Sequence, residues 1–212
     1  MDKEKIKKAL DELKTQPKRK FSQTYDLIVN LKNFEIKKHP IDFFVNLPYS
    51  SGKKIKVAAF VGPQMEDEAE KTVDLVIKEA DFSKYADKKM AKKLAVDYDY
   101  FIAQANLMPK IAQTFGKVLG IRGKMPNPKL GCVVPPNTNL APLVEKLSKA
   151  VRLVAKKGMN LQSMVGKEDQ TDDEVIENIL AVYNSIIKNV PNEMQNVKNV
   201  LLKLTMGKPV KV

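Results

Sequence analysis

The sequence predicts a two-domain protein of mixed α/β and α+β class, in which an α+β domain built from both termini carries an inserted Rossmann-like α/β domain with a parallel sheet. Strand-like alternation occurs near both ends of the chain, whereas short wholly apolar segments alternate with helical ones in the middle. A small, flexible segment at residues 49–53 separates the two styles. We therefore expect one domain at residues 1–52 and 152–212 and the other at 53–151, an arrangement that permits hinge motion.

The first domain begins with a predicted amphipathic helix over residues 3–14, whose apolar residues recur at helical spacing among charges. Pro17 breaks this helix within a polar, basic stretch at residues 15–20. Residues 25–31 then alternate apolar and polar side chains, and residues 41–47 form a second extended run. Both patterns predict strands of a half-buried sheet.

The centre of the chain alternates strands of the buried type with helices, which indicates a small parallel sheet with right-handed crossovers. We expect strands at residues 55–61 and 100–105, and helices at residues 66–79, 88–95, 107–119 and 139–150.

After Val151 the earlier style returns, with candidate strands at residues 152–155 and 159–165. Acidic residues after Thr171 favour a helix start, because carboxylates stabilise the positive end of the helix dipole. That helix carries an apolar stripe of Val175, Ile176, Ile179, Val182 and Ile186. A last strand at residues 197–204 ends in a Thr-Met-Gly turn at residues 205–207.

The charge balance favours a polyanionic partner such as nucleic acid or an acidic membrane. The chain has 37 Lys and Arg against 25 Asp and Glu, a formal charge of +12 and a pI near 9.5. The alternative is a solvated lysine-rich surface. One Cys132 excludes an intrachain disulfide, and one His39 leaves too few soft ligands for structural zinc. Without a signal-like or membrane-spanning run, a reducing cytoplasm is expected.

One long central segment, residues 116–133, reads Gly-Lys-Val-Leu-Gly-Ile-Arg-Gly-Lys-Met-Pro-Asn-Pro-Lys-Leu-Gly-Cys-Val. It resembles the signature of the L-one family of large-subunit ribosomal proteins, although Cys132 stands where that family usually has Thr. Three further segments resemble the same family, at residues 20–26, 165–167 and 205–207. The similarity covers nearly the whole chain, and a short connection between Leu31 and Asp42 is typical of the archaeal type.

This resemblance implies a non-enzymatic protein of the mobile ribosomal stalk near the transfer-RNA exit site, without a cofactor. The implied partners are large-subunit ribosomal RNA, a similar structure in the protein's own messenger RNA that it represses, and exit-site transfer RNA through the stalk. We expect a ribosomal, cytoplasmic protein that is a monomer when free and has no membrane partner.

The resemblance places the RNA site on the terminal domain, with the Thr-Met-Gly turn at its centre. Gly207 would let an RNA backbone approach, Thr205 would offer a hydroxyl, and Met206 would pack on a sugar or base. By its pattern alone the segment is only a turn after a strand. The implied RNA-binding residues are Lys20, Phe21, Ser22, Thr24, Asp26, Ser163, Gly166, Lys167, Thr205, Met206 and Gly207.

The other members of this set have separate expected roles. Phe21 follows a basic run, so it could stack on RNA, although a phenylalanine more often lies in the core. Ser22, Thr24 and Asp26 alternate on one face and could bind ribose hydroxyls. Lys20 and Lys167 would neutralise phosphates and so position the RNA rather than specify it.

Alternative sites have weaker support. Residues 116–131 lack the P-loop pattern and follow a helix, so we expect a rigid basic loop that is either structural or a secondary RNA contact. Gly62 is one glycine where a dinucleotide fingerprint requires three. The carboxylates of residues 66–70 are explained by the helix dipole rather than by magnesium. No motif builds a catalytic triad around His39.

Two rival functions predict different behaviour. An α/β enzyme holding a phosphorylated small molecule in the inserted domain would be stabilised thermally by a nucleotide. A non-ribosomal interaction module would keep the fold but lose the segments at residues 20–24 and 205–207, which are intact here.

Overall fold

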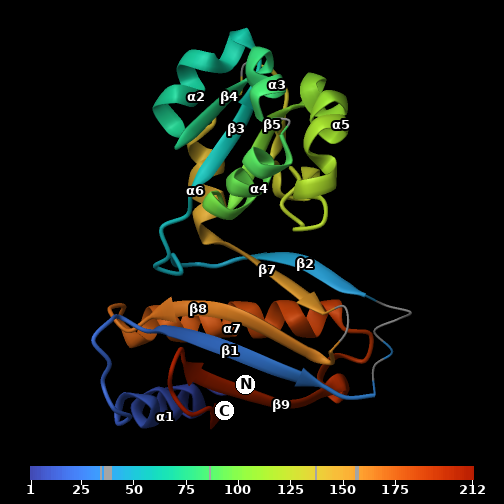
Figure 1. The fold of residues 1–212 in the computed structure, drawn as a ribbon. Coiled ribbons are helices and arrows are strands. Elements are labelled where there is room, and N and C mark those ends of the chain that lie inside the picture. The colour runs from blue at the N-terminus through green and yellow to red at the C-terminus, as the bar shows by residue number, and fades with distance from the viewer. Residues whose placement is uncertain (34, 36–39, 86, 137, 156–157) are drawn as a thin grey trace. The chain divides into compact units, whose positions relative to one another are not determined.

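The computed structural model describes residues 1–33, 35, 40–85, 87–136, 138–155 and 158–212, so the prediction about His39 lies outside the described residues. The chain forms two compact units, one of Met1–Lys53 with Lys149–Val212 and one of Lys54–Ser148 (Figure 1). The mixed α/β and α+β fold class is confirmed. Among the described residues, no helix has the length and apolar character needed to span a bilayer.

The first unit is built on a four-stranded antiparallel sheet with strand order β10-β9-β1-β8. The central strand β1 shows strict alternation between buried and half-buried residues, as its sequence pattern predicts. A separate antiparallel pair is formed by β2 and β7. The strands of this unit are β1 (Thr24–Leu31), β2 (Ile41–Asn46), β7 (Ala150–Ala155), β8 (Asn160–Lys167), β9 (Val197–Leu204) and β10 (Val210–Lys211).

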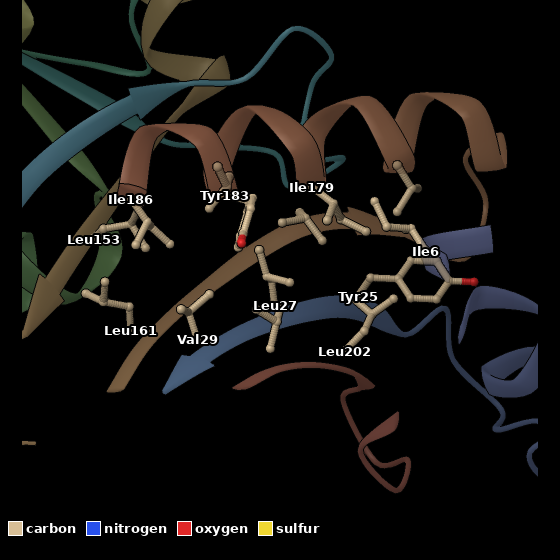
Figure 2. Close-up of a cluster of buried hydrophobic side chains, with 14 of the residues drawn as sticks. Ile6, Tyr25, Leu27, Val29, Leu153, Leu161, Ile179, Tyr183, Ile186 and Leu202 are labelled. Atoms are coloured by element: carbon tan, nitrogen blue, oxygen red, sulfur yellow. The ribbon is translucent and has the colours of Figure 1, made fainter. Parts of the chain in front are cut away.

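Helices α1 (Lys3–Lys14) and α7 (Asp172–Asn189) pack their apolar stripes on one face of this sheet. Figure 2 shows side chains of α7, such as Ile179, facing Leu27 of β1. Burying each such side chain contributes about 1.5 to 3 kcal/mol to folding. The alternate residues of β1 point to the opposite face and remain partly exposed, which leaves that face able to present polar groups.

Asn178 is a fully buried polar residue in the middle of α7. Its amide nitrogen donates to the carbonyl of Val165 (2.9 Å), and its amide oxygen accepts from the backbone N–H of Tyr49 (3.0 Å). Both ends of the amide are therefore satisfied, which removes the cost of burying it. This residue fixes the end of β8 and the segment after β2 against α7.

The second unit is a four-stranded parallel sheet with order β4-β3-β5-β6, so the expected parallel sheet is confirmed. All five residues of β3 are buried. Phe60 of β3 lies among Phe82, Phe101 and Phe115, with ring centroids 5.0 to 5.8 Å away. The elements are β3 (Val57–Val61), β4 (Leu75–Lys78), β5 (Tyr100–Gln104), β6 (Val133–Val134), α2 (Glu66–Thr72), α3 (Phe82–Tyr85), α4 (Lys88–Asp97), α5 (Met108–Leu119) and α6 (Ala141–Lys149).

The helix expected at residues 66–79 is wrong in its second half. The helix ends at Thr72, and Leu75–Lys78 forms strand β4 beside β3. The apolar run at residues 75–77, which includes the β-branched Val76 and Ile77, gains parallel hydrogen bonds and burial there, which overrides its helix-compatible spacing. Several short elements were also not expected: β6, β10, α3 and the 3-10 turns Pro63–Met65, Glu79–Asp81, Ala105–Leu107, Pro128–Leu130 and Glu193–Asn196.

Candidate nucleic-acid interface

Three strand ends meet at one end of the antiparallel sheet. β1 begins at Thr24, opposite the last residue of β8, Lys167. The next residue, Tyr25, lies opposite the last residue of β9, Leu204. The sheet register therefore brings together the segments before β1, after β8 and after β9, which are far apart in sequence.

Thr24 and Thr205 join the two termini directly. The Thr24 N–H donates to Thr205 Oγ1 (3.1 Å), the Thr205 N–H donates to the Thr24 carbonyl (3.1 Å), and the two hydroxyls lie 2.8 Å apart. Only one hydroxyl hydrogen is needed for the bond between the two oxygens. The pair can thus remain locked and still offer hydrogen-bonding capacity to a ligand.

Phe21 and Met206 are large apolar side chains left in solvent beside this lock. Phe21 is 52% exposed and Met206 is 61% exposed. Phe21 therefore does not lie in the core, although that is the commoner position for a phenylalanine. Met206 is held through its backbone, because its N–H donates to the Gln23 side chain (3.1 Å). An aromatic ring and a flexible thioether on one basic surface can pack on bases and sugars.

Gln23 and Glu168 belong to this site but were missed from the sequence. Gln23 is 2% exposed, and its side chain and N–H both donate to the Glu168 carboxylate (3.3 and 2.9 Å). The neighbouring Ser22 hydroxyl donates to Asp169 (2.6 Å). The pairs are about 145 residues apart in sequence, so no local pattern signals these contacts.

Asp26 and Lys203 face each other across β1 and β9 on the partly exposed side of the sheet. Burial raises the pKa of the Asp26 carboxyl above its usual value, and the positive charge of Lys203 partly offsets this rise. The Lys203 ammonium donates to the Thr205 carbonyl (3.1 Å). Lys203 thus adds to this site a cation that is absent from the RNA-binding residues predicted from the sequence.

Lys20 and Lys167 flank the same strand ends. Lys20 is exposed, whereas Lys167 is half-buried and its aliphatic stem lies about 3.1 Å from where a Cβ on Gly52 would stand. We define the strand-end surface as those residues of the predicted RNA-binding set that are partly or fully accessible to solvent, together with Lys203. Its members are Lys20, Phe21, Ser22, Thr24, Asp26, Lys167, Lys203, Thr205, Met206 and Gly207.

Ser163 and Gly166 do not join this surface. Ser163 is 5% exposed on the core side of β8, and its hydroxyl donates to the Met164 carbonyl (3.2 Å). A Cβ on Gly166 would lie 2.8 Å from the Gln170 side chain and 2.9 Å from Val175. The structure therefore gives both residues a packing role inside the unit, and their direct contact with RNA stays a prediction.

Gly207 also has an internal reason to be glycine. A Cβ there would lie 2.5 Å from Gln16 Oε1 and 3.0 Å from the Leu204 Cβ. The Gln16 amide accepts from the Lys208 N–H (2.8 Å) and donates to the Lys208 carbonyl (3.0 Å), which fixes the turn. The space on the Cβ side of Gly207 is thus taken by the protein's own chain, while the residue itself stays partly exposed.

Comparison with known proteins decides the family. A sequence profile described as "Ribosomal protein L1p/L10e family" matches residues 13–208. The chain belongs to this family. Similar curated proteins are called "Large ribosomal subunit protein uL1". The one from Nanoarchaeum equitans is 45% identical over 92% of this chain and 93% of its own length. The one from Methanothermococcus thermolithotrophicus is 39% identical over 100% and 99%.

Membership of the L1p/L10e family assigns the chain to the large-subunit ribosomal proteins, and these are structural proteins rather than enzymes. The rival reading as an α/β enzyme is therefore set aside. Gly62, the glycine compared with the dinucleotide fingerprint, has a contact inside the fold. The Gly62 N–H already donates to the buried Gln104 side chain (2.8 Å), and a Cβ there would lie 2.9 Å from the same oxygen.

Three carboxylates of the cluster rejected as a magnesium site, those of Glu66, Glu68 and Glu70, bind groups within the protein. Lys78 binds Glu66 (2.6 Å) and Glu70 (3.5 Å), and Glu68 accepts from the Leu140 N–H (3.1 Å). These contacts tie α2 to β4 and to the segment before α6. They give the acidic cluster a structural purpose in addition to its place at a helix start.

The family signature segment begins in the last turn of α5, which ends at Leu119, and its loop at residues 120–131 supports the end of α4. Arg122 donates to the Ala95 carbonyl (3.3 Å), and Lys124 donates to the Tyr98 carbonyl (2.6 Å). Cations at a helix C-terminus satisfy its last carbonyls and complement its dipole. Burial raises the pKa of the nearby Cys132 thiol to about 11, so it stays protonated at neutral pH. These contacts support the structural reading of the loop, while Lys129 remains exposed.

Proposed function

We propose that this chain binds large-subunit ribosomal RNA through the strand-end surface of its first unit. The observation that carries the proposal is the lock between Thr24 and Thr205. This lock joins two segments from opposite ends of the chain, and each segment carries one large, exposed apolar side chain, Phe21 or Met206. A partner that needs both segments can bind only the folded protein.

The chemistry of this surface suits RNA better than duplex DNA or a membrane. Hydroxyls and a carboxylate can bind ribose 2′-OH groups, which only RNA provides. Exposed lysines can neutralise phosphates, and Phe21 can stack on a base. Recognition then depends on RNA shape and on sugar contacts, because the major groove of an A-form helix is too narrow for side chains to read.

The finer proposal concerns which RNA is bound and by which part of the chain. We assign binding to residues 1–52 and 152–212, and we treat residues 53–151 as an inserted domain that moves relative to them. The bound RNA is that of the mobile stalk beside the transfer-RNA exit site, which brings exit-site transfer RNA near the protein. A similar fold in the protein's own messenger RNA would make the chain a translational repressor.

A salt titration tests the proposal. The affinity for a large-subunit ribosomal RNA stalk fragment is measured at increasing salt, and each phosphate contact contributes roughly 0.7 to 0.9 to the log-log slope. Contacts by Lys20 and Lys167 predict a slope of at least about 1.4 in magnitude. A slope near zero, or equal affinity for a DNA duplex of the same length, would contradict the proposal.

Messenger repression is tested separately. The RNA transcribed from the start of the chain's own gene should compete with the stalk fragment for the same surface. Competition that survives loss of the Met206 side chain would place the messenger elsewhere and overturn the repressor proposal.

A further inference from the structure

Gln23 stands between the Thr-Met-Gly turn and the connection from β8 to α7. It is 2% exposed although Phe21 and Met206 on either side of it are in solvent. Its amide oxygen accepts the Met206 N–H (3.1 Å), and its amide nitrogen donates to Glu168 Oε1 (3.3 Å). One buried side chain therefore joins the exposed turn to Glu168.

The Glu168 carboxylate determines which way the Gln23 amide points. A primary amide has one accepting end and one donating end. Met206 N–H needs the acceptor, and a carboxylate needs the donor. Two further bonds join these residues: the Gln23 N–H donates to the side-chain atom Glu168 Oε2 (2.9 Å), and the Glu168 N–H donates to the Gln23 carbonyl (3.0 Å). The arrangement has no second orientation that satisfies every group.

Met206 lies in a turn whose flanking residues are fixed by other bonds, because the Thr205 N–H donates to the Thr24 carbonyl (3.1 Å) and the Gly207 N–H donates to the Leu204 carbonyl (3.0 Å). Its own N–H donates to Gln23, and its side chain is 61% exposed. We propose that Glu168 acts through Gln23 as a positioning pair, which holds Met206 in the place that RNA binding requires. The inference rests on the proposed function, and neither residue of the pair needs to touch the RNA.

A charge effect of opposite sign distinguishes this proposal from simple electrostatics. Glu168 is an anion beside a basic surface, so its charge alone opposes RNA binding. Removing that charge by Glu168→Gln would strengthen binding if only electrostatics mattered. The positioning pair predicts weaker binding, because the new amide presents a donor to the Gln23 donor, and turning either amide moves the mismatch to another partner.

Four variants make the test. Glu168→Gln, Gln23→Glu, the double exchange of both and Glu168→Asp are titrated with the ribosomal RNA stalk fragment at several salt concentrations. The double exchange keeps the net charge and can remake each hydrogen bond with one donor reversed. Glu168→Asp keeps the charge but withdraws the carboxylate from Gln23. Thermal unfolding of every variant is measured in parallel, so that loss of fold is separated from loss of position.

Glu168→Gln should bind about ten-fold more weakly, the effect of one mismatched hydrogen bond. Glu168→Asp should weaken binding in the same direction because it loses the contact, and Gln23→Glu should bind at least as weakly because it sets two carboxylates against each other. The double exchange should return to within about three-fold of wild type, because its bonds are complete again. The salt slope should be unchanged in all four variants, since no phosphate contact is removed. If a single variant unfolds in the assay, the double exchange should restore both the fold and the RNA affinity, and that recovery would support the positioning pair.

Asp169→Asn is the matched control, because it removes the same charge one residue away and keeps an oxygen acceptor for the Ser22 hydroxyl. Its affinity should equal or exceed that of wild type. The inference is overturned if Glu168→Gln binds as tightly as wild type, or if the double exchange stays as weak as the single variants. Absence of RNA binding by the wild-type chain would instead refute the proposed function.

Discussion

Met206 contributes most of the exposed apolar surface at the Thr-Met-Gly turn. Met206→Asp should weaken binding of the ribosomal RNA stalk fragment at least about ten-fold, because it replaces packing on the RNA with a charge that repels phosphate. The stability should barely change, since the side chain is 61% exposed. An electrophoretic or calorimetric titration measures the affinity.

Met194 offers a control for this substitution. It has the same 61% exposure and lies in the turn before β9, at the opposite end of the strand from Met206. Met194→Asp should leave RNA affinity within about two-fold of wild type, as expected for a surface change away from the site. Equal losses in the two variants would show that the effect is general electrostatics rather than a site at Met206.

Gly166 illustrates a glycine required by packing. Gly166→Ala should lower the free energy of unfolding by about 1 to 3 kcal/mol, because the added methyl would overlap Val175 and Gln170. Gly116→Ala in α5 should instead raise it by about 0.5 to 1 kcal/mol, since nothing lies within 4 Å and alanine favours the helix. Chemical denaturation of both variants measures the difference. Similar changes at the two sites would refute this account of Gly166.

At the scale of elements, the layer between β1, α1 and α7 contains the phenol of Tyr25. Burial raises its pKa to about 12, and the carboxylates of Asp172 and Glu168 act in the same direction. The unfolded chain loses this proton near pH 10, whereas the folded protein keeps it up to about pH 12. The protonated Tyr25 phenol therefore makes its full contribution to the free energy of unfolding below pH 10. That contribution is lost as the pH rises from about 10 to about 12. The free energy of unfolding of Tyr25→Phe, measured by chemical denaturation, should fall less between pH 10 and pH 12 than that of wild type. Identical pH dependence in the two proteins would contradict the role given to this phenol.

The contact between the signature loop and α4 is tested by comparing two lysines. Lys124→Met should lower the free energy of unfolding by about 1 kcal/mol and leave RNA affinity unchanged, because Lys124 binds the Tyr98 carbonyl at the helix end. Lys129→Met should change neither quantity if the loop is structural, since Lys129 is exposed. Weaker RNA binding in both variants would instead identify the loop as a secondary RNA contact.

The sequence was informative where local pattern is decisive. Alternation in β1 and the apolar stripe of α7 predicted their buried faces correctly, because the core of this unit is built from those faces. Strand β4 was mistaken for the continuation of a helix, since its parallel partner β3 is not visible from nearby residues. Gly166 lies in a family-like segment and Ser163 lies just before it, but which side of the sheet each residue occupies depends on the strand register.

The roles of Gln23 and Glu168 could not be predicted for a related reason. Neither residue belongs to a recognisable motif, and each becomes informative only when the fold brings it beside Met206. The Thr-Met-Gly turn was predicted from its pattern after a strand, and its part in RNA binding, which the family resemblance implies, stays a prediction.

At the scale of the whole molecule, the two chain termini form one unit and the inserted segment forms the other, each with its own core. The first unit combines its own core with the strand-end surface, and the second unit has a separate core around Phe60. A net charge of +12 raises affinity for any RNA, so bulk binding alone does not locate the site. Location requires a residue-level measurement.

The most direct test is a map of backbone amide NMR shifts as the ribosomal RNA stalk fragment is added to the intact protein. The largest changes should fall in three segments, residues 20–26, 166–168 and 203–207, with smaller changes in the second unit. Changes confined to residues 116–131, or spread evenly over lysine-rich surfaces of both units, would contradict a composite RNA site built from the two ends of the chain.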